Sequence, residues 1–247
     1  MLTDSAGRWQ TPLLPAYAQD FALRVDHPEY LPKKDVGAAE PVTINLLREQ
    51  RAVITLEHAC ALSGRVVGSD GKAVAEARVA LGGSGKPSPV ADDEVVPTCY
   101  TDAAGRFRIA GLRPGTGLLA VRFEAHAPAL LTVDVGPDTP PVEVQLTDGE
   151  VLRGRVVDEE GRPIQGVRVS FNEWNGADAS LIRYIDDTDG EGRHVWNHAP
   201  RGTVKLDYEK VGYLPKQMSL AVPPATDYQV TLVRAANPNY RPDTGPP

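Results

Sequence analysis

The sequence predicts an all-β protein built from tandem antiparallel Greek-key β-sandwiches. Three observations support this fold class: two phrases that recur along the chain, apolar and polar residues that alternate with a period of two, and turns rich in Gly, Pro and Asp. No long stretch has the 3.6-residue apolar period of an amphipathic helix. These patterns are typical of short-stranded sandwiches, in which each strand buries one face.

The two recurring phrases appear in the same order. The phrase that begins Leu62-Ser-Gly-Arg-Val-Val returns as Leu152-Arg-Gly-Arg-Val-Val, an offset of 90 residues (62 to 152). A second phrase, Thr101-Asp-Ala-Ala-Gly-Arg-Phe107, matches Thr3–Trp9 before it and, more loosely, Thr188–His194 after it. Two separate phrases rarely recur in one order by chance, so they define copies of one structural unit.

The phrases divide the chain into about two and a half copies of this unit. Residues 59–148 and 149–235 are each predicted to form a complete β-sandwich, and we call them the middle module and the last module. Residues 236–247 are a Pro-rich tail without a strand pattern. Residues 1–58 are a partial repeat that matches only the later strands of a copy.

The partial repeat has apolar strand faces, at Phe21, Leu23 and Val25 and again at 43–46 and 53–56, but no opening strands. A sandwich without its first strands exposes unpaired backbone and apolar surface, which proteins normally avoid. Docking onto the middle module, strands borrowed from another chain, or sequence upstream of the first residue would complete it. We favour the upstream sequence.

Alternation assigns the buried face of each strand. In the middle module, Val79 and Leu81 face one side of a strand, while Arg78 and Ala80 face the other. The last module repeats the pattern. The predicted core positions are Val66, Val79, Leu81, Phe107, Val121, Val133, Val144, Val156, Val169, Leu206, Leu220 and Val230.

The composition describes a soluble chain and excludes several partners. The formal net charge is −7 and Lys and Arg are dispersed, so we expect no nucleic-acid surface. No apolar run is long enough to span a bilayer, and the first residues lack the basic and apolar regions of a signal peptide. Cys60 and Cys99 allow an intramodule disulfide, although we favour two buried free thiols.

Several segments carry a family resemblance. They are Gly64–Val67, Ala77–Leu81, Thr101–Phe107 and Gly111–Gly115, and, in the last module, Gly154–Asp158, Gly161–Gly166 and Gly212-Tyr213. These segments resemble the carboxypeptidase regulatory-like module, a transthyretin-like (prealbumin-like) sandwich. This module is related to Cna-B-type modules and is often found in tandem in bacterial envelope and secreted proteins. The resemblance implies a structural, spacer or binding role in an extracytoplasmic protein, which would be periplasmic, cell-surface or secreted.

The loop around Trp174 is the predicted ligand site. This residue is an aromatic side chain within a polar turn, Asn172-Glu-Trp-Asn-Gly176, where core packing does not explain it. Aromatic rings pack on the apolar face of a sugar, so carbohydrate is the candidate ligand. The candidate ligand-binding residues are Asn172, Trp174, Asn175 and Tyr184.

Two patterns raise the question of a metal site. Asp187, Asp189 and Glu191 alternate like calcium-loop ligands, but His198 stands where the bidentate Glu is expected. We favour an Asp-Gly hairpin turn, with weak calcium binding as the alternative. His194 and His198 have the spacing of a helical metal pair, but they lie in a strand pattern. We therefore expect no metal and no other cofactor.

The sequence favours a non-catalytic protein. It has no Gly-x-Ser-x-Gly elbow, Cys–His pair or paired carboxylates at a strand end, and none of the five histidines is followed three residues later by Glu. The favoured function is the spacer or binding part of a larger protein, with other domains of a longer chain or another protein as partners. The alternatives are a carbohydrate- or ligand-binding module and the accessory region of a peptidase whose catalytic domain lies elsewhere.

Overall fold

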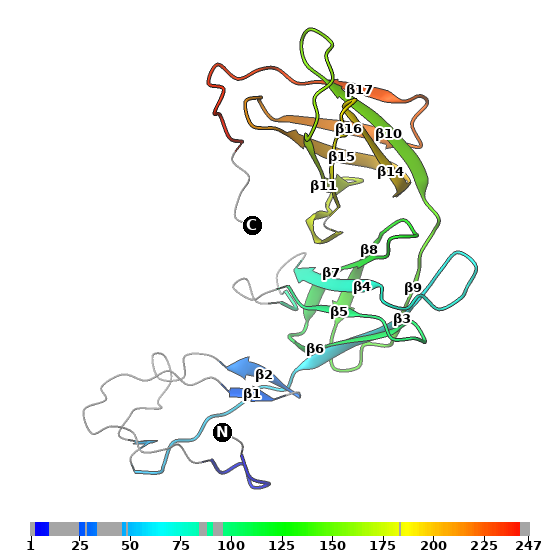
Figure 1. Ribbon diagram of the computed structural model, residues 1–247. Helices are drawn as coiled ribbons and strands as arrows, with labels where there is room; N and C mark the ends of the chain where they lie inside the picture. Colours follow the sequence, from blue (N-terminus) through cyan, green and yellow to red (C-terminus); the bar gives the residue numbers. More distant parts are fainter. Residues whose placement is uncertain are drawn as a thin grey trace. The chain divides into compact units, whose positions relative to one another are not determined.

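The computed structural model describes residues 3–9, 25–27, 29–33, 46–47, 49–83, 88–90, 96–182 and 184–242. In this part of the chain nearly all regular structure is β-strand (Figure 1). Two compact units are present: Met1–Cys60 with Ala110–Leu112, and Ala61–Ile109 with Arg113–Pro247. The second unit contains most of the middle module and all of the last module.

The described residues of the first unit include a short hairpin. Strands β1 (Val25–His27) and β2 (Tyr30–Lys33) pair antiparallel. Residues 53–56 were predicted as a strand but lie outside regular structure, and Val53 is exposed. This prediction was wrong because a period of two in apolar residues fits any extended segment. A β-strand also needs a hydrogen-bonded ladder to a neighbouring strand. The predicted strand positions Phe21, Leu23 and 43–45 lie outside the described residues.

The middle module is a two-sheet sandwich. One sheet has the order β6-β3-β9 and the other the order β5-β4-β7-β8. Most pairs are antiparallel, but β3 and β9, the first and last strands, run parallel. The strands are β3 (Cys60–Val67), β4 (Arg78–Gly83), β5 (Thr98–Tyr100), β6 (Arg106–Leu112), β7 (Gly115–Arg122), β8 (Ala129–Val135) and β9 (Val142–Gln145).

The last module repeats this strand order. Its sheets are β14-β10-β17 and β12-β11-β15-β16, with β13 also paired to β11, and β10 and β17 are parallel. Thus β13 takes the place of β5, while β12 and a short 3-10 helix, η1 (Ser180–Ile182), are additions. The strands are β10 (Glu150–Val157), β11 (Arg168–Trp174), β12 (Ala177–Asp178), β13 (Ile185–Asp187), β14 (Arg193–Ala199), β15 (Gly202–Glu209), β16 (Lys216–Val222) and β17 (Tyr228–Thr231).

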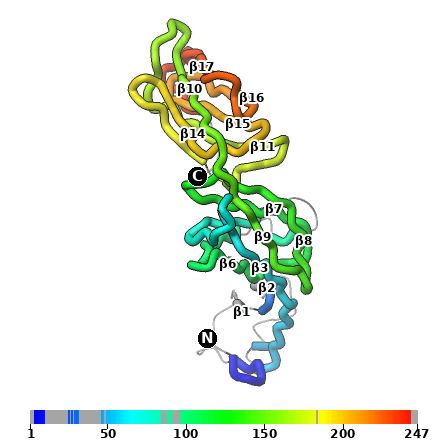
Figure 2. The backbone as a smooth tube through the Cα atoms, turned by 90° about the vertical axis from the view of Figure 1, so that its right-hand side faces the viewer, coloured from blue at the N-terminus to red at the C-terminus, as the bar shows by residue number. Residues whose placement is uncertain are grey.

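The predicted fold class is confirmed by these sheets, and the predicted core positions are all buried. Burying one Val, Leu or Phe side chain contributes roughly 1.5–3 kcal/mol of stability, so the alternating residues supply most of the drive to form each sandwich. Figure 2 shows the chain passing from the middle module to the last module through the segment between β9 and β10. Cys60 is buried, Cys99 is half-buried, and neither is disulfide-bonded.

One turn motif, Asp-x-x-Gly-Arg, occurs four times among the described residues. In each copy the Asp carboxylate accepts hydrogen bonds from two backbone N–H groups of the turn, and the glycine has a φ between 72° and 79°, which favours glycine over other residues. The copies are Asp4–Arg8, Asp102–Arg106, Asp158–Arg162 and Asp189–Arg193. The second and fourth copies dock on the first strand of their module, because Val66 N–H donates to Gly105 O and Val156 N–H donates to Gly192 O.

Candidate functional site

The short helix η1 forms a contact between the middle and last modules. The Asp178 carboxylate accepts the Ser180 N–H and starts the helix, while the Ile182 side chain is buried in the core of the last module. Leu181 lies between these anchors and packs over Gly82 of β4, where an added Cβ would be 2.8 Å from the Leu181 side chain. The Arg78 guanidinium donates a hydrogen bond of 2.8 Å to the Leu181 carbonyl oxygen.

Small residues occupy the middle of the face of β4 and β7 that lies under η1. Ala80 and Ala120 are paired across β4 and β7, and both are buried although they point away from the core of their own sandwich. Ala120 is packed in the hydrophobic core of the last module. The equivalent pair in the last module is polar, Ser170 and Asp207. Small side chains allow η1 to approach the sheet closely, so this face is shaped for contact.

The segment between β9 and β10 is also held by contacts. His198 of β14 donates from Nδ1 to the Asp148 carbonyl oxygen at 2.7 Å. Gly149 has a φ of 75°, and an added Cβ would be 2.8 Å from the His198 carbonyl carbon and 2.9 Å from the Ala127 Cβ. Only glycine fits this position without displacing its neighbours.

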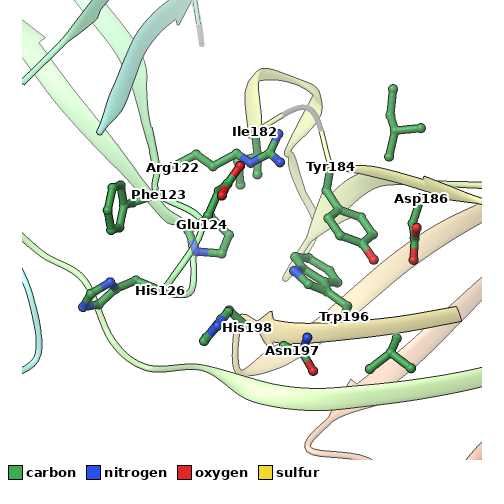
Figure 3. Close-up of a pocket in the computed structure, with 13 residues that line it drawn as sticks. Arg122, Phe123, Glu124, His126, Ile182, Tyr184, Asp186, Trp196, Asn197 and His198 are labelled. Atoms are coloured by element: carbon green, nitrogen blue, oxygen red, sulfur yellow. The ribbon is translucent and has the colours of Figure 1, made fainter. Parts of the chain in front are cut away.

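A cavity of about 290 Å³ lies beside this contact. Figure 3 shows Tyr184 and Trp196 on its last-module side, with Arg122, Glu124 and His126 on its middle-module side. The rings of Tyr184 and Trp196 are stacked, with centroids 4.1 Å apart. The cavity therefore combines an aromatic wall with charged and imidazole groups.

Tyr184 is the candidate ligand residue that lies at the cavity. Its hydroxyl is buried, on the side of the Asp186 carboxylate. Burial, and secondarily the negative charge of Asp186, raises the pKa of this hydroxyl above its ordinary value. The phenol is therefore neutral at physiological pH and offers a hydrogen-bond donor.

The other three candidate residues lie elsewhere in the last module. Trp174 is half-buried against the core, and its Nε1–H donates to the Arg201 carbonyl oxygen at 2.8 Å. Asn175 has a φ of 50° and its side-chain oxygen accepts the Thr203 N–H, so it forms the turn that joins β11 to β12. The Asn172 side chain donates to the Asp207 carboxylate on the outer face of β11 and β15. The structure thus gives each of these side chains an internal partner, and Asn172, Trp174 and Asn175 do not line the cavity at which Tyr184 lies.

The calcium candidates belong to a turn and its flanking strand. Asp189 directs its carboxylate to the N–H groups of Glu191 and Arg193, and those hydrogen bonds lower its pKa. Glu191 pairs with the Arg193 guanidinium, and Asp187 ends β13. No cluster of three or more His, Cys, Asp or Glu side chains suited to a metal is found in the described part of the chain. The hydrogen bonds at this turn are those expected of an Asp-Gly hairpin turn.

Sequence reasoning missed Leu181 and Arg78 as contact residues. The available signal was the row of small residues Ala80, Gly82 and Ala120 on a strand face where solvent-facing residues are usually polar. That row indicates close approach by another element, but it does not identify η1.

One family model matches the middle module. Residues 61–147 match the carboxypeptidase regulatory-like domain. The expected resemblance is confirmed over this segment. No curated protein matches the sequence. No helix in the described residues has the length and apolar character needed to cross a membrane.

Several solved structures show a distant likeness to this chain. A streptococcal ancillary pilin is 14% identical, with 90% of this chain and 74% of that chain covered and a TM-score of 0.33. The shaft pilin SpaA from Lactobacillus rhamnosus GG is 11% identical over 72% of this chain and 99% of its own, with a TM-score of 0.28. The 3-chlorocatechol 1,2-dioxygenase from Rhodococcus opacus 1CP is 20% identical over 35% of this chain and 61% of its own, also with a TM-score of 0.28.

Proposed function

We propose that this chain is a non-catalytic spacer in which the middle and last modules are held at a fixed mutual geometry within a larger extracytoplasmic protein or assembly. The observation that supports this function is the packing of η1 on β4 and β7. A spacer must keep its two ends at a defined distance and orientation. Neighbouring modules keep such a geometry when they share buried contacts and are not joined only by a flexible linker.

Three features of the contact support a fixed geometry. The Leu181 side chain occupies space that only glycine at position 82 leaves open. The Arg78 hydrogen bond to the Leu181 carbonyl oxygen is partly buried and therefore less exposed to competition from water. The connection of four residues between β9 and β10, 146–149, gives the modules little freedom to separate.

Unfolding of paired variants tests this function. Leu181→Ala removes the packing on Gly82, and Arg78→Ala removes the hydrogen bond, so each should lower the unfolding midpoint of the full chain. Because both changes act on the same contact, their combined effect should differ from the sum of the single effects by more than about 0.5 kcal/mol. Leu214→Ala, at an exposed position away from η1, is the control and should be additive with either change. Strict additivity of Arg78→Ala and Leu181→Ala would contradict the proposal.

Ligand binding is the second candidate function, and the cavity beside Tyr184 and Trp196 favours it. The aromatic wall and the buried Tyr184 hydroxyl provide a surface and a donor that a sugar could use. A glycan array with the full chain tests it, with Tyr184→Phe for the cavity and Trp174→Ala for the β11–β12 turn. Binding lost only in Tyr184→Phe would assign the cavity, and binding lost only in Trp174→Ala would assign the turn. Absence of binding by the unmodified chain would exclude this function for the sugars tested.

A further inference from the structure

A chain of polar side chains replaces apolar residues in the core of the last module. His194 in β14, Tyr208 in β15 and Tyr228 in β17 take the positions that Phe107, Val121 and Val142 hold in the middle module. His194 is only 2% exposed and Tyr208 is fully buried. Buried polar groups cost stability unless they are hydrogen-bonded, so the replacement of three apolar residues by polar ones needs a structural explanation.

The three side chains form a directed hydrogen-bond chain. The Tyr208 hydroxyl donates to the Tyr228 hydroxyl at 3.0 Å, which leaves the Tyr228 proton to be donated to His194 Nε2 at 2.7 Å. His194 Nε2 is then an acceptor, and the imidazole is neutral with its proton on Nδ1. The His194 Nδ1 atom is buried and has no hydrogen-bond partner among the described residues.

Protonation of His194 is incompatible with this arrangement. A proton on Nε2 would be donated to the Tyr228 oxygen, which can accept it together with the Tyr208 proton, so Tyr228 could no longer donate its own proton to His194. Among the described residues, His194 is the only acceptor for the Tyr228 hydroxyl, so the Tyr228 proton would then be buried without a partner. Protonation would also place a positive charge in the core, where His194 is 2% exposed and its Nδ1–H, unpaired in both protonation states, gives no compensation.

The surrounding groups give limited compensation for such a charge. Tyr208 and Tyr228 present ring edges or faces at centroid distances of 5.9 and 5.7 Å, and both are neutral because burial raises the pKa of their hydroxyls. Asp186 on β13 is the carboxylate that acts on His194, and Tyr184 on the same side is neutral. Burial lowers the pKa of His194 below its ordinary value, against the opposing attraction of Asp186.

We propose that His194, Tyr228 and Tyr208 form a pH-sensitive switch that holds the final strand β17 on β10 while His194 is neutral and releases it under mild acid. The strand β17 is the element that moves because Tyr228 begins it and Gly154 of β10 lies directly opposite. An added Cβ on Gly154 would lie 2.4 Å from His194 Nε2 and 2.5 Å from the Tyr228 ring. The His194 and Tyr228 side chains therefore have no spare room in which to rearrange.

The pH dependence has a definite sign. A histidine whose pKa is lower in the folded state binds fewer protons there than in the unfolded state. The last module therefore has its highest free energy of unfolding at pH values above the ordinary histidine pKa. This free energy falls as the pH is lowered through that pKa. The middle module, with Phe107 at this position, lacks this dependence.

Amide hydrogen exchange of the full chain at about pH 7.5 and about pH 5, corrected for intrinsic rates, tests the switch because this interval spans ordinary histidine titration. Protection of β10 and β17 should fall at the lower pH, while that of β3 and β9 is unchanged. His194→Phe, the residue of the middle module, should abolish the difference, whereas His198→Gln, a change in the same strand, should retain it. The proposal is overturned if His194→Phe keeps the pH dependence or if the unmodified chain shows none.

Tyr228→Phe provides an independent readout that does not depend on removing the imidazole. This change breaks the hydroxyl chain but leaves His194 buried, so β17 should lose protection at both pH values while the pH dependence remains. In parallel, the imidazole NMR shifts of the unmodified chain should report a neutral His194 throughout the folded range. An imidazole that titrates in the folded state without loss of β17 protection would contradict the switch.

Discussion

Phe107 in β6 and His194 in β14 occupy equivalent positions, and each ring lies against a glycine of the neighbouring strand. An added Cβ on Gly64 would be 2.7 Å from the Phe107 ring, and one on Gly154 would be 2.4 Å from His194 Nε2. The two modules thus use the same device, a glycine under a ring, although one ring is apolar and the other polar. Together with the close approach of the Val142 carbonyl oxygen to Gly64 and of the Tyr228 ring to Gly154, these rings explain why the Gly-Arg-Val-Val phrase begins with glycine in both copies.

Gly64→Ala and Gly154→Ala should each destabilise their own module. Overpacking a filled core costs typically about 1–3 kcal/mol because neighbouring side chains must leave their preferred rotamers. Chemical denaturation of the single variants measures this cost. Gly190→Ala is the control, since a Cβ there meets nothing within 4 Å, and a cost as large as that of Gly64→Ala would show that the effect does not come from the ring.

Two glycines of the Asp-x-x-Gly-Arg motif should differ in their tolerance of alanine. Gly105 and Gly161 have similar positive φ values, 74° and 79°, so both variants should lose about 1–2 kcal/mol from backbone strain. An added Cβ at Gly105 would also be 2.4 Å from the Val66 carbonyl oxygen, whereas at Gly161 it would meet nothing within 4 Å. Gly105→Ala should therefore cost more in equilibrium unfolding. Equal losses would mean that the docking of this turn on β3 is unimportant.

Asp158 should be the most sensitive carboxylate of the four turns. Its side chain is buried and interacts with both Arg162 and Arg234, at 2.8 and 3.3 Å. Burial alone would raise its pKa, but hydrogen bonds from Arg162 and then Arg234 hold the pKa well below its ordinary value. A carboxylate with a depressed folded pKa stabilises the protein above its unfolded pKa and loses this contribution as the pH falls.

Asp158→Asn should therefore lower the unfolding midpoint at neutral pH, and the difference from the unmodified chain should shrink under strong acid. Thermal unfolding across pH measures it. Asp102→Asn is the matched control, because Asp102 has the same turn and an Arg106 contact but a more exposed side chain. A larger effect at Asp102 than at Asp158 would contradict the role given to burial and to Arg234.

Phe107→Ala should destabilise the middle module by about 3–5 kcal/mol, the usual cost of truncating a buried aromatic side chain. Phe107 is 5% exposed and fills the space beside Gly64. Denaturant unfolding gives the loss in free energy. A loss below about 1 kcal/mol would mean that the ring is not a core element.

The sequence predicts the strands and the core well because alternation is enforced by burial of one strand face. The apolar period of two assigns Val79 and Leu81, and Val169 in the last module, to the inward face of their strands. The contact made by Leu181 could not be found in this way, because its three-residue helix is too short to leave a periodic signal. Trp174 lies in a polar turn by sequence, yet the tertiary contact of its indole N–H with the Arg201 carbonyl oxygen depends on a residue far along the chain.

The distance between the middle and last modules tests the central claim most directly. Spin labels at Glu143 and Gln217, both exposed, would report that distance in a chain with Cys60→Ala and Cys99→Ser, and a pair at Asp187 and Gln217 would give the reference width within one module. We expect the distance distribution between modules to be as narrow as the reference and to broaden in the Arg78→Ala, Leu181→Ala double variant. A broad distribution in the chain with its η1 contact intact would contradict a fixed spacer.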